Sequence, residues 1–188
     1  EEAYSLGIVF GKSAEEIAQG FFTFAQEGYN AEQTVERMQA ALLLTTTGVV
    51  DMNDAANALG AVIENYPEYI DNITAAVDKW FAVQASTAVS TQDLVKAMET
   101  VGNSAAMVGV NLDQLNGIIA AVRTSTRKSG TAIANAFKLI FSKYTTEEGV
   151  KAFQNLGIAV MEADGEFRPF MDTIGDLQEK WGDLNEQQ

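Results

Sequence analysis

Three pairs of carboxylates at short spacing are the first candidates for acid–base chemistry. They are Glu15 with Glu16, Asp51 with Asp54, and Glu147 with Glu148. Two carboxylates act as general acid and base only when they converge in a cleft around a substrate. Each of these pairs instead lies where a helix is predicted to begin, and the helix dipole stabilises acidic side chains there. We therefore interpret them as helix-start residues.

The composition removes most other catalytic chemistry. The chain has 188 residues with 0 Cys and 0 His, which excludes thiol nucleophiles, Ser-His-Asp triads and zinc sites built from these ligands. Ser129 has no neighbouring base to activate its hydroxyl. The glycines Gly102, Gly109 and Gly130 do not precede the Lys-Ser or Lys-Thr pair of a phosphate-binding loop. The sequence therefore predicts no enzyme activity, cofactor, metal site or small-molecule substrate.

Charge further limits the possible partners. Acidic residues outnumber basic ones by 26 to 12, which gives a net charge of -14. A chain this acidic is a poor binder of nucleic acid and is repelled by anionic membranes. The longest apolar stretch, residues 40–44, is also far too short to span a bilayer. We therefore predict no direct nucleic-acid contact and no membrane association.

Residues 123–151 depart from this acidic character. Their basic side chains are Arg123, Arg127, Lys128, Lys138, Lys143 and Lys151. One interpretation is a basic helix pair that packs beside acidic neighbours of the same chain. The other is a docking surface for an acidic partner. The acidic field of the surrounding chain argues against nucleic acid as that partner.

Helix-start signals recur along the chain at a regular interval. In a capping box, a side-chain oxygen and an acid or amide three residues later satisfy backbone N–H groups at a helix start. Capping boxes fall at residues 13, 30, 51, 90, 111 and 145, Asp71 and Ser129 are candidate caps without the full box, and apolar residues between these starts follow the helical period. We predict an all-α fold of about eight antiparallel helices in a helical-hairpin array or bundle, with Trp80 and Trp181 in its core.

Residues 157–168 interrupt the helical pattern. They alternate weakly around Asp164-Gly165, which is a two-residue hairpin turn signal. We predict a small β-hairpin here, with Pro169 in the first turn of a final helix. The spacing of acids around Asp164 does not match a calcium loop. The expected domains are a helical domain over residues 1–156, and the hairpin with the C-terminal helix packed on it over residues 157–188.

Two predicted helix joints resemble each other. Gly28 and Asn30 recur 81 positions later as Gly109 and Asn111, and each Asn is followed three residues on by Gln. In such a joint, Gly ends one helix in the left-handed conformation and Asn caps the next. A helical-hairpin unit of about 40 residues used several times would produce this similarity. Independent convergence on the same turn chemistry is the alternative.

The order of several short motifs resembles a known family. The motifs are GKSAEEI at 11–17, AQEGYN at 25–30, VGNSAAMVGVN at 101–111, SGTAI at 129–133, LGIAV at 156–160 and DGEFRPF at 164–170. Together they resemble the core region of bacteriophage tail tape measure proteins, the tail length determinator family. The resemblance implies structural roles for Gly28, Asn30, Gly102, Gly109, Asn111, Gly130, Thr131, Gly157, Asp164 and Gly165.

The resemblance implies a structural function. A tape measure protein sets tail length during assembly, lies in the lumen of the virion tail, and is shed ahead of the genome at ejection. Its expected partners are the tail tube, other tail-assembly proteins and tail assembly chaperones, which it meets in the host cytoplasm. A compact chain of this size is too short to be the ruler itself, so we expect one folded module of a larger polypeptide.

Two other functions fit the same composition. The first is a helical adaptor or scaffold outside phage tails that binds a partner helix in a groove. The second is a cell-wall hydrolase, which would have to rely on carboxylates alone because His and Cys are absent.

Overall fold

The chain is built from α-helices. The computed structural model describes residues 2–26, 28–46 and 48–183, and these contain ten α-helices and no strand. The helices are α1 (Glu2–Phe10), α2 (Ala14–Gln26), α3 (Ala31–Thr45), α4 (Met52–Asn65), α5 (Thr74–Ser86), α6 (Thr91–Met107), α7 (Leu112–Thr126), α8 (Gly130–Tyr144), α9 (Glu147–Asn155) and α10 (Phe170–Lys180), with 3-10 turns at Pro67–Tyr69 and Trp181–Asp183. The predicted all-α class is confirmed.

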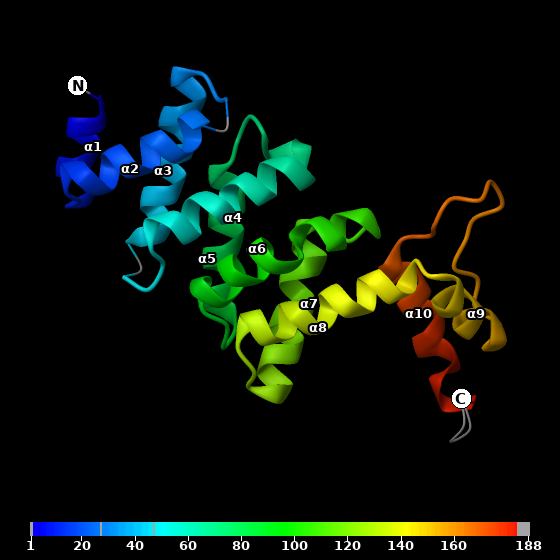
Figure 1. The fold of residues 1–188 in the computed structure, drawn as a ribbon. Helices are drawn as coiled ribbons and strands as arrows, with labels where there is room; N and C mark the ends of the chain where they lie inside the picture. The colour runs from blue at the N-terminus through cyan, green and yellow to red at the C-terminus, as the bar shows by residue number, and fades with distance from the viewer. Residues whose placement is uncertain (1, 27, 47, 184–188) are drawn as a thin grey trace.

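The helices form a larger body and a smaller lobe. Figure 1 shows α1 to α7 packed along the body, while α8 runs out of it and leads to α9 and α10 at the opposite end from the N-terminus. The predicted antiparallel bundle is not confirmed. Because α8 extends away from the body, the last two helices pack against its far end.

Helix α6 is at the centre of the body and contacts α4, α5, α7 and α8. Its apolar residues Leu94, Met98 and Val101 recur at helical spacing and are all buried. The small residues Ala97 and Ala105 are buried on the same helix and let neighbouring helices approach closely. This stripe of large and small side chains explains why α6 can pack against four other helices.

Most of the predicted helix starts are confirmed. Side chains that cap the following helix stand at Ser13, Asn30, Asp51, Ser90, Asn111 and Ser129. The start expected at residue 145 lies one residue later, at Thr146, whose hydroxyl accepts the Gly149 N–H. The start expected at Asp71 is wrong, because the 3-10 turn after Pro67 delays α5 until Thr74.

The predicted hairpin at 157–168 is not confirmed. An antiparallel bridge joins Met161 and Phe167, and the Arg168 N–H donates to the Val160 carbonyl at 2.9 Å, but no named strand forms in the described residues. Two short arms with no third described strand beside them are marginal as a sheet. Pro169 occupies the cap position immediately before α10, one residue earlier than expected.

Only one of the two tryptophans lies in the core. Trp80 is 0% exposed, as predicted, and its indole N–H donates to Asn116 Oδ1 at 3.2 Å. The prediction for Trp181 is wrong, because this side chain is 68% exposed. The buried residues of α10, Phe170 and Thr173, are in its first turn. The helix therefore extends past its packing partners before it reaches Trp181.

The N-terminus of α8 touches α6 at a position where only glycine fits. A Cβ atom on Gly130 would lie 2.2 Å from the Asp93 carbonyl oxygen and 2.6 Å from the Asp93 Cα. The Gly130 N–H donates to Asp93 Oδ1 at 2.6 Å. Arg123 of α7 forms an ion pair with the other carboxylate oxygen at 3.3 Å, and Ser90 donates to it at 2.8 Å. Asp93 thus joins the starts of α6 and α8 to the end of α7.

Replacing Gly130 with Ala forces these helices apart. We expect a loss of about 2–4 kcal/mol in the free energy of unfolding, because a backbone contact cannot yield as a flexible side chain can. The matched control is Gly117→Ala in α7, where a Cβ meets nothing within 4 Å. That change should stabilise by about 0.5–1 kcal/mol through helix propensity. Urea denaturation of both variants tests this, and equal effects would contradict it.

The Asp93 contacts also predict a pH dependence. Burial alone raises the pKa of Asp93, but hydrogen bonds from Gly130 and Ser90, with the charge of Arg123, lower it below its ordinary value. Because the pKa of Asp93 is lower in the folded than in the unfolded protein, its contacts stabilise the fold fully above about pH 4. This stabilisation is lost as the pH falls through the pKa of Asp93 in the folded protein. Asp93→Asn should therefore destabilise the protein at pH 7, and by less at pH 3, with the exposed Asp78→Asn as a surface control. Urea midpoints at both pH values measure this, and a pH-independent difference would contradict it.

Candidate functional site: an apolar groove between α8, α9 and α10

The α6–α7 joint holds the smaller lobe against the body. The Val108 carbonyl accepts the Phe170 N–H at 2.9 Å, and the Val110 carbonyl accepts the Tyr66 hydroxyl at 3.2 Å. Gly109 has φ +71°, and a Cβ there would lie 3.3 Å from the Pro169 Cα. The structural role expected for Gly109 is therefore a contact between two segments that are about 60 residues apart.

The α2–α3 joint repeats the local chemistry of the α6–α7 joint. Asn30 and Asn111 both cap a helix, and the Gln three residues later accepts the Asn backbone N–H in each case. Gly28 has φ +86°, but a Cβ there would meet nothing within 4 Å. The two capping boxes are alike, and only the second joint carries a docked segment. A whole repeat of about 40 residues stays a prediction.

A buried arginine packs beside the α2–α3 joint. The Arg37 guanidinium carbon lies 3.9 Å from the centre of the Tyr29 ring, and its Nη1 donates to the Gln33 carbonyl at 3.0 Å. Within the described part of the chain Arg37 has no ion pair, and its Nε and Nη2 have no hydrogen-bond partner. The sequence did not indicate that Arg37 is buried, because arginine side chains are seldom fully buried unless they are paired with an acidic group.

The remaining motif residues are spread over the chain. Gly102 faces Met98, whose sulfur would lie 2.4 Å from an added Cβ, and Thr131 is exposed beside Gly130. Gly157 ends α9 with φ +71°. Asp164 accepts the Glu166 N–H at 3.1 Å in the turn that contains Gly165 at φ +91°. These residues shape the backbone locally and are not brought together in one site.

The predicted basic segment is divided into two parts. Arg123 is occupied by Asp93 and by the carbonyls of Arg127 and Lys128, to which its Nη1 donates at 2.8 and 3.0 Å. Arg127 has the left-handed conformation, φ 58°, and ends α7. Lys138 and Lys143 lie on α8, about 12 and 20 Å along the helix from its first residue, Gly130. The structure therefore does not gather the basic residues of this segment into one patch.

The carboxylate pairs occupy helix starts, as predicted. Glu16 accepts the Ser13 N–H at 3.0 Å, and hydrogen bonds from Ser13 lower its pKa. Asp51 caps α4, while Asp54 pairs with Lys96 of α6. Among the described residues no group of three or more acidic side chains could hold a metal ion. None of the described helices is long and apolar enough to cross a membrane.

Tyr144 holds the smaller lobe together at the end of α8. Its hydroxyl donates to the Arg168 carbonyl at 2.8 Å and shares a hydrogen bond with the Thr173 hydroxyl at 2.8 Å. Its ring meets Phe153 and Phe170 edge-on, with centroids 5.9 and 5.2 Å apart. Burial raises the pKa of Tyr144. The residue therefore connects α8, α9 and the segment that leads into α10.

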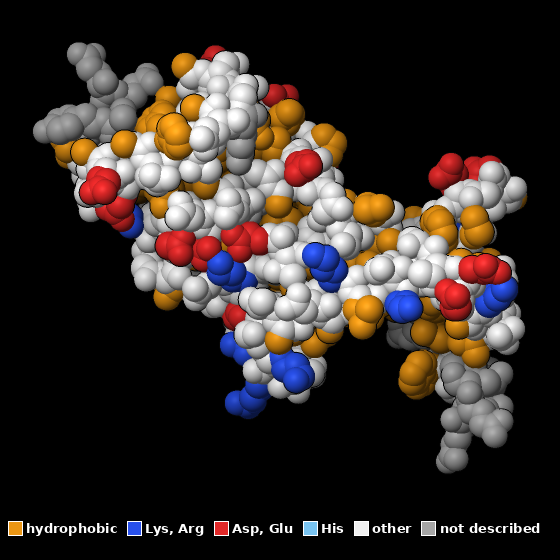
Figure 2. Space-filling model, viewed as in Figure 1, with side chains coloured by type: hydrophobic (Ala, Val, Ile, Leu, Met, Phe, Trp, Pro, Cys, Tyr) orange, Lys and Arg blue, Asp and Glu red, His pale blue; other side chains and the backbone are white. Residues whose placement is uncertain are grey.

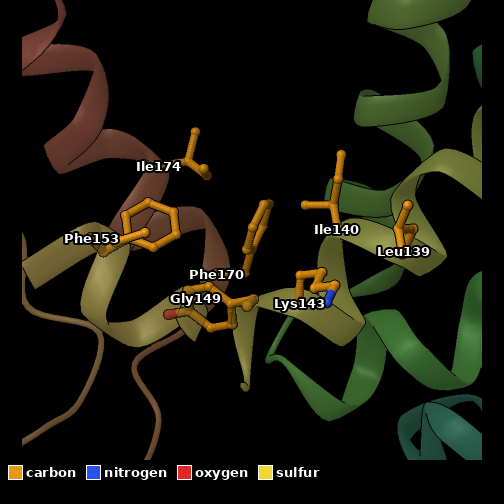
Figure 3. Close-up of a pocket in the computed structure, with 9 residues that line it drawn as sticks. Leu139, Ile140, Lys143, Gly149, Phe153, Phe170 and Ile174 are labelled. Atoms are coloured by element: carbon orange, nitrogen blue, oxygen red, sulfur yellow. The ribbon is translucent and has the colours of Figure 1, made fainter. Parts of the chain in front are cut away.

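An apolar groove opens beside Tyr144, between the three helices of this lobe. Its cavity volume is about 350 Å³. The lining residues are Leu139, Ile140, Lys143 and Tyr144 of α8, Gly149, Ala152 and Phe153 of α9, and Phe170 and Ile174 of α10. Figure 3 shows Phe170 between Phe153 on one side and Ile140 on the other, with Ile174 facing them from α10. Almost every group that borders the space is hydrocarbon.

The groove continues onto solvent-exposed apolar residues. Leu139 is 62% exposed and Ile140 is 43% exposed, although both are large side chains on α8. Figure 2 shows hydrophobic side chains at the surface beside the smaller lobe. The helical period of the apolar residues did not indicate this exposed surface on α8. The signal was present, since α8 carries apolar residues on more of its circumference than one buried stripe needs.

Comparison with known proteins agrees with the motif order. The family model for phage-related minor tail proteins matches residues 1–188. The chain belongs to this family. The chain is also similar to a tape measure protein of Pneumococcus phage Dp-1, with 24% identity over 190 residues. The resemblance to tape measure proteins is thereby confirmed.

The aligned region covers 100% of this chain but only 16% of the Dp-1 protein. No solved structure matches the chain.

The two glycine joints give a matched test of how the smaller lobe is held. Gly28→Ala and Gly109→Ala both impose about 1 kcal/mol of left-handed backbone strain. Only Gly109→Ala also presses on Pro169. We expect faster hydrogen exchange in α10 for Gly109→Ala and unchanged exchange there for Gly28→Ala. Equal exchange in α10 for both variants would contradict the docking role of Gly109.

Proposed function

We propose that this chain is a folded, non-enzymatic module of a tail tape measure protein, a structural protein that sets tail length during assembly. The observation that carries the proposal is the similarity of the complete chain to one part of the Dp-1 tape measure protein. The match of all 188 residues to the minor tail family supports it. The chain would then be part of a longer polypeptide, as the aligned region is in the relative.

The dimensions of the chain support a role beside the ruler segment itself. The longest described helix, α6, has 17 residues and spans about 25 Å. The same 188 residues in one continuous helix would span about 280 Å. Because the helices fold back on one another, this module adds little length per residue. We infer that extended segments elsewhere in the parent protein measure the tail.

The proposed location and partners follow from the same role. The module would lie in the tail lumen of the virion after assembly and in the host cytoplasm before it. Its partners would be the tail tube, other tail-assembly proteins and tail assembly chaperones. The engagement of the candidate carboxylates in caps and ion pairs supports a non-enzymatic role, since such groups are not free to converge on a substrate.

In-frame deletion of residues 1–188 from the parent gene of a phage that carries it tests the tail role. We expect particles that lack tails or have tails of altered length, and a plasmid copy of the intact gene should restore them. Electron microscopy of the particles measures tail length. Tails of normal length from the deletion phage would contradict the proposal and favour an adaptor function outside the tail.

The same phage separates a structural role from an enzymatic one. Glu15→Gln with Glu16→Gln, and Glu147→Gln with Glu148→Gln, remove carboxylates from exposed helix starts. We expect normal plaques and normal tails from both double variants, with a loss of about 1 kcal/mol or less in stability. Loss of infection with intact tails would indicate catalysis by these groups.

A further inference from the structure

Alternate helices of the body stack into two layers. In the first layer α2 contacts α4, α4 contacts α6 and α6 contacts α8, and these helices follow one another along the molecule (Figure 1). In the second layer α1 contacts α3, α3 contacts α5 and α5 contacts α7. Each second-layer helix also contacts the first-layer helix that comes next in sequence, as α1 does with α2 and α3 with α4. Arrays of helical hairpins are built in this way, with each unit packed against its neighbours.

The first-layer helices begin at a nearly constant interval. Their capping side chains belong to Ser13, Asp51, Ser90 and Ser129, which are 38, 39 and 39 residues apart. Each residue of one helix can therefore be compared with residues at the same distance from the other caps. The fourth residue after the cap is apolar and buried in all four helices: Ile17, Ala55, Leu94 and Ile133. Equivalent positions thus have equivalent surroundings.

Contacts between α4 and α6 show which face of a first-layer helix packs on the helix before it. Asn103 Nδ2 of α6 donates to Asn65 Oδ1 of α4 at 3.0 Å. Lys96 of α6 pairs with Asp54 of α4, and Glu99 pairs with Lys96 at 3.2 Å. These residues of α6 stand six, nine and thirteen positions after its cap and share one face. That face lies toward the preceding helix.

A neighbouring stripe of positions also lies toward the preceding helix. It includes the first residue after the cap. In α4 this residue is Met52, whose sulfur would lie 3.2 Å from a Cβ added to Gly20 of α2. In α8 it is Gly130, which lies against Asp93 of α6. Positions five and twelve residues after the cap share this stripe, and they are buried in the three later helices: Ala56 and Ile63 in α4, Val95 and Gly102 in α6, Ala134 and Phe141 in α8.

On α2 the corresponding face is exposed and apolar. The positions five and twelve residues after its cap are Ala18 and Ala25, and both are exposed. Phe22 stands between them, at the position that Glu99 has on α6, and it is 57% exposed. The unit at the end of a helical array normally has a polar outer face. The apolar spacing of i, i+4 and i+7 on α2 is instead typical of a face that another helix covers.

We propose that a helix of the parent polypeptide, preceding α1 in sequence, packs on Ala18, Phe22 and Ala25 of α2. It would contact α2 as α2 contacts α4, and it would form a hairpin with α1. This arrangement explains why α1 stands in the second layer, beside α3, without a first-layer helix of its own. The proposal rests on the proposed function only in that the chain is part of a longer polypeptide, as the aligned 16% of the Dp-1 protein is.

Photocrosslinking in the purified parent polypeptide identifies what covers this face. Benzoylphenylalanine in place of Phe22 attaches to its neighbours under ultraviolet light, and mass spectrometry of the peptides locates the attachment. We expect it within the roughly 40 residues that precede residue 1, because one hairpin unit has about that length. The same probe in place of Met107, which is 76% exposed on α6, should not attach there. Mixing unlabelled with isotope-labelled protein separates attachment within one chain from attachment to a second copy.

Thiol labelling measures how completely the face is covered. The chain has 0 Cys, so one introduced thiol reports on its own position. Phe22→Cys should react with a maleimide at least about tenfold more slowly in the parent polypeptide than in the 188-residue chain, since a covered thiol reacts only during local opening. The matched control Met107→Cys should react at rates within about twofold of each other in the two proteins. Circular dichroism confirms that both variants are folded.

Several results would overturn the proposal. These are attachment of the probe at Phe22 to a later segment of the parent, to a second copy or to nothing, and equal slowing of both thiols in the parent polypeptide. A parent gene that encodes no helix before residue 1 would overturn it as well. Each of these results leaves the tails of the deletion phage unchanged, so failure of this proposal is distinguishable from failure of the proposed function.

Discussion

The close approach of α6 and α8 at Gly130 is the contact on which the rest of the structure depends. Here the backbone of one helix start lies against the backbone of another, and the Asp93 carboxylate accepts the Gly130 N–H. Helix α6 packs against α4, α5 and α7 at the centre of the body, and α8 leads from the body to the smaller lobe. The geometry of this one crossing therefore sets the direction in which α8 leaves the body. The position of the apolar groove follows from it.

A second set of contacts holds the smaller lobe through backbone carbonyls. Val108 accepts the Phe170 N–H, and Tyr144 donates to the Arg168 carbonyl. Lys180 reaches back to the Leu156 and Gly157 carbonyls at the end of α9. These bonds order the segment before α10 without a sheet and leave the outer face of α8 uncovered. The smaller lobe therefore presents an apolar surface at the end of the molecule away from α1.

Local chemistry made much of the helical arrangement predictable. The side chains of Asn30, Ser90 and Asn111 satisfy N–H groups within their own first turn, so the sequence alone was enough to place these helix starts. The helix start predicted at Asp71 was wrong, because the 3-10 turn at Pro67–Tyr69 displaces the start of α5. The glycine motif indicated tight joints, but it could not show that Pro169 packs on Gly109.

Features that depend on neighbours far along the chain were not predictable. Trp181 has the spacing of a core residue, yet no element of the described residues covers its side chain. The hairpin signal at Asp164 and Gly165 produced a single bridge because no third strand supports it. The basic segment gave no sign that Asp93 pairs with Arg123 while Lys143 lines an apolar groove. In each case the outcome depends on which segment packs beside the residue in the folded chain.

Native-state hydrogen exchange of the whole chain tests the central claim most directly. If the α6–α8 crossing organises the fold, the amides of α6 and of the first half of α8 exchange only through global unfolding, with the slowest rates in the protein. The amides of α9 and α10 then exchange earlier, through opening of the smaller lobe alone. Slow exchange of α9 and α10 with fast exchange of α6 would contradict this account.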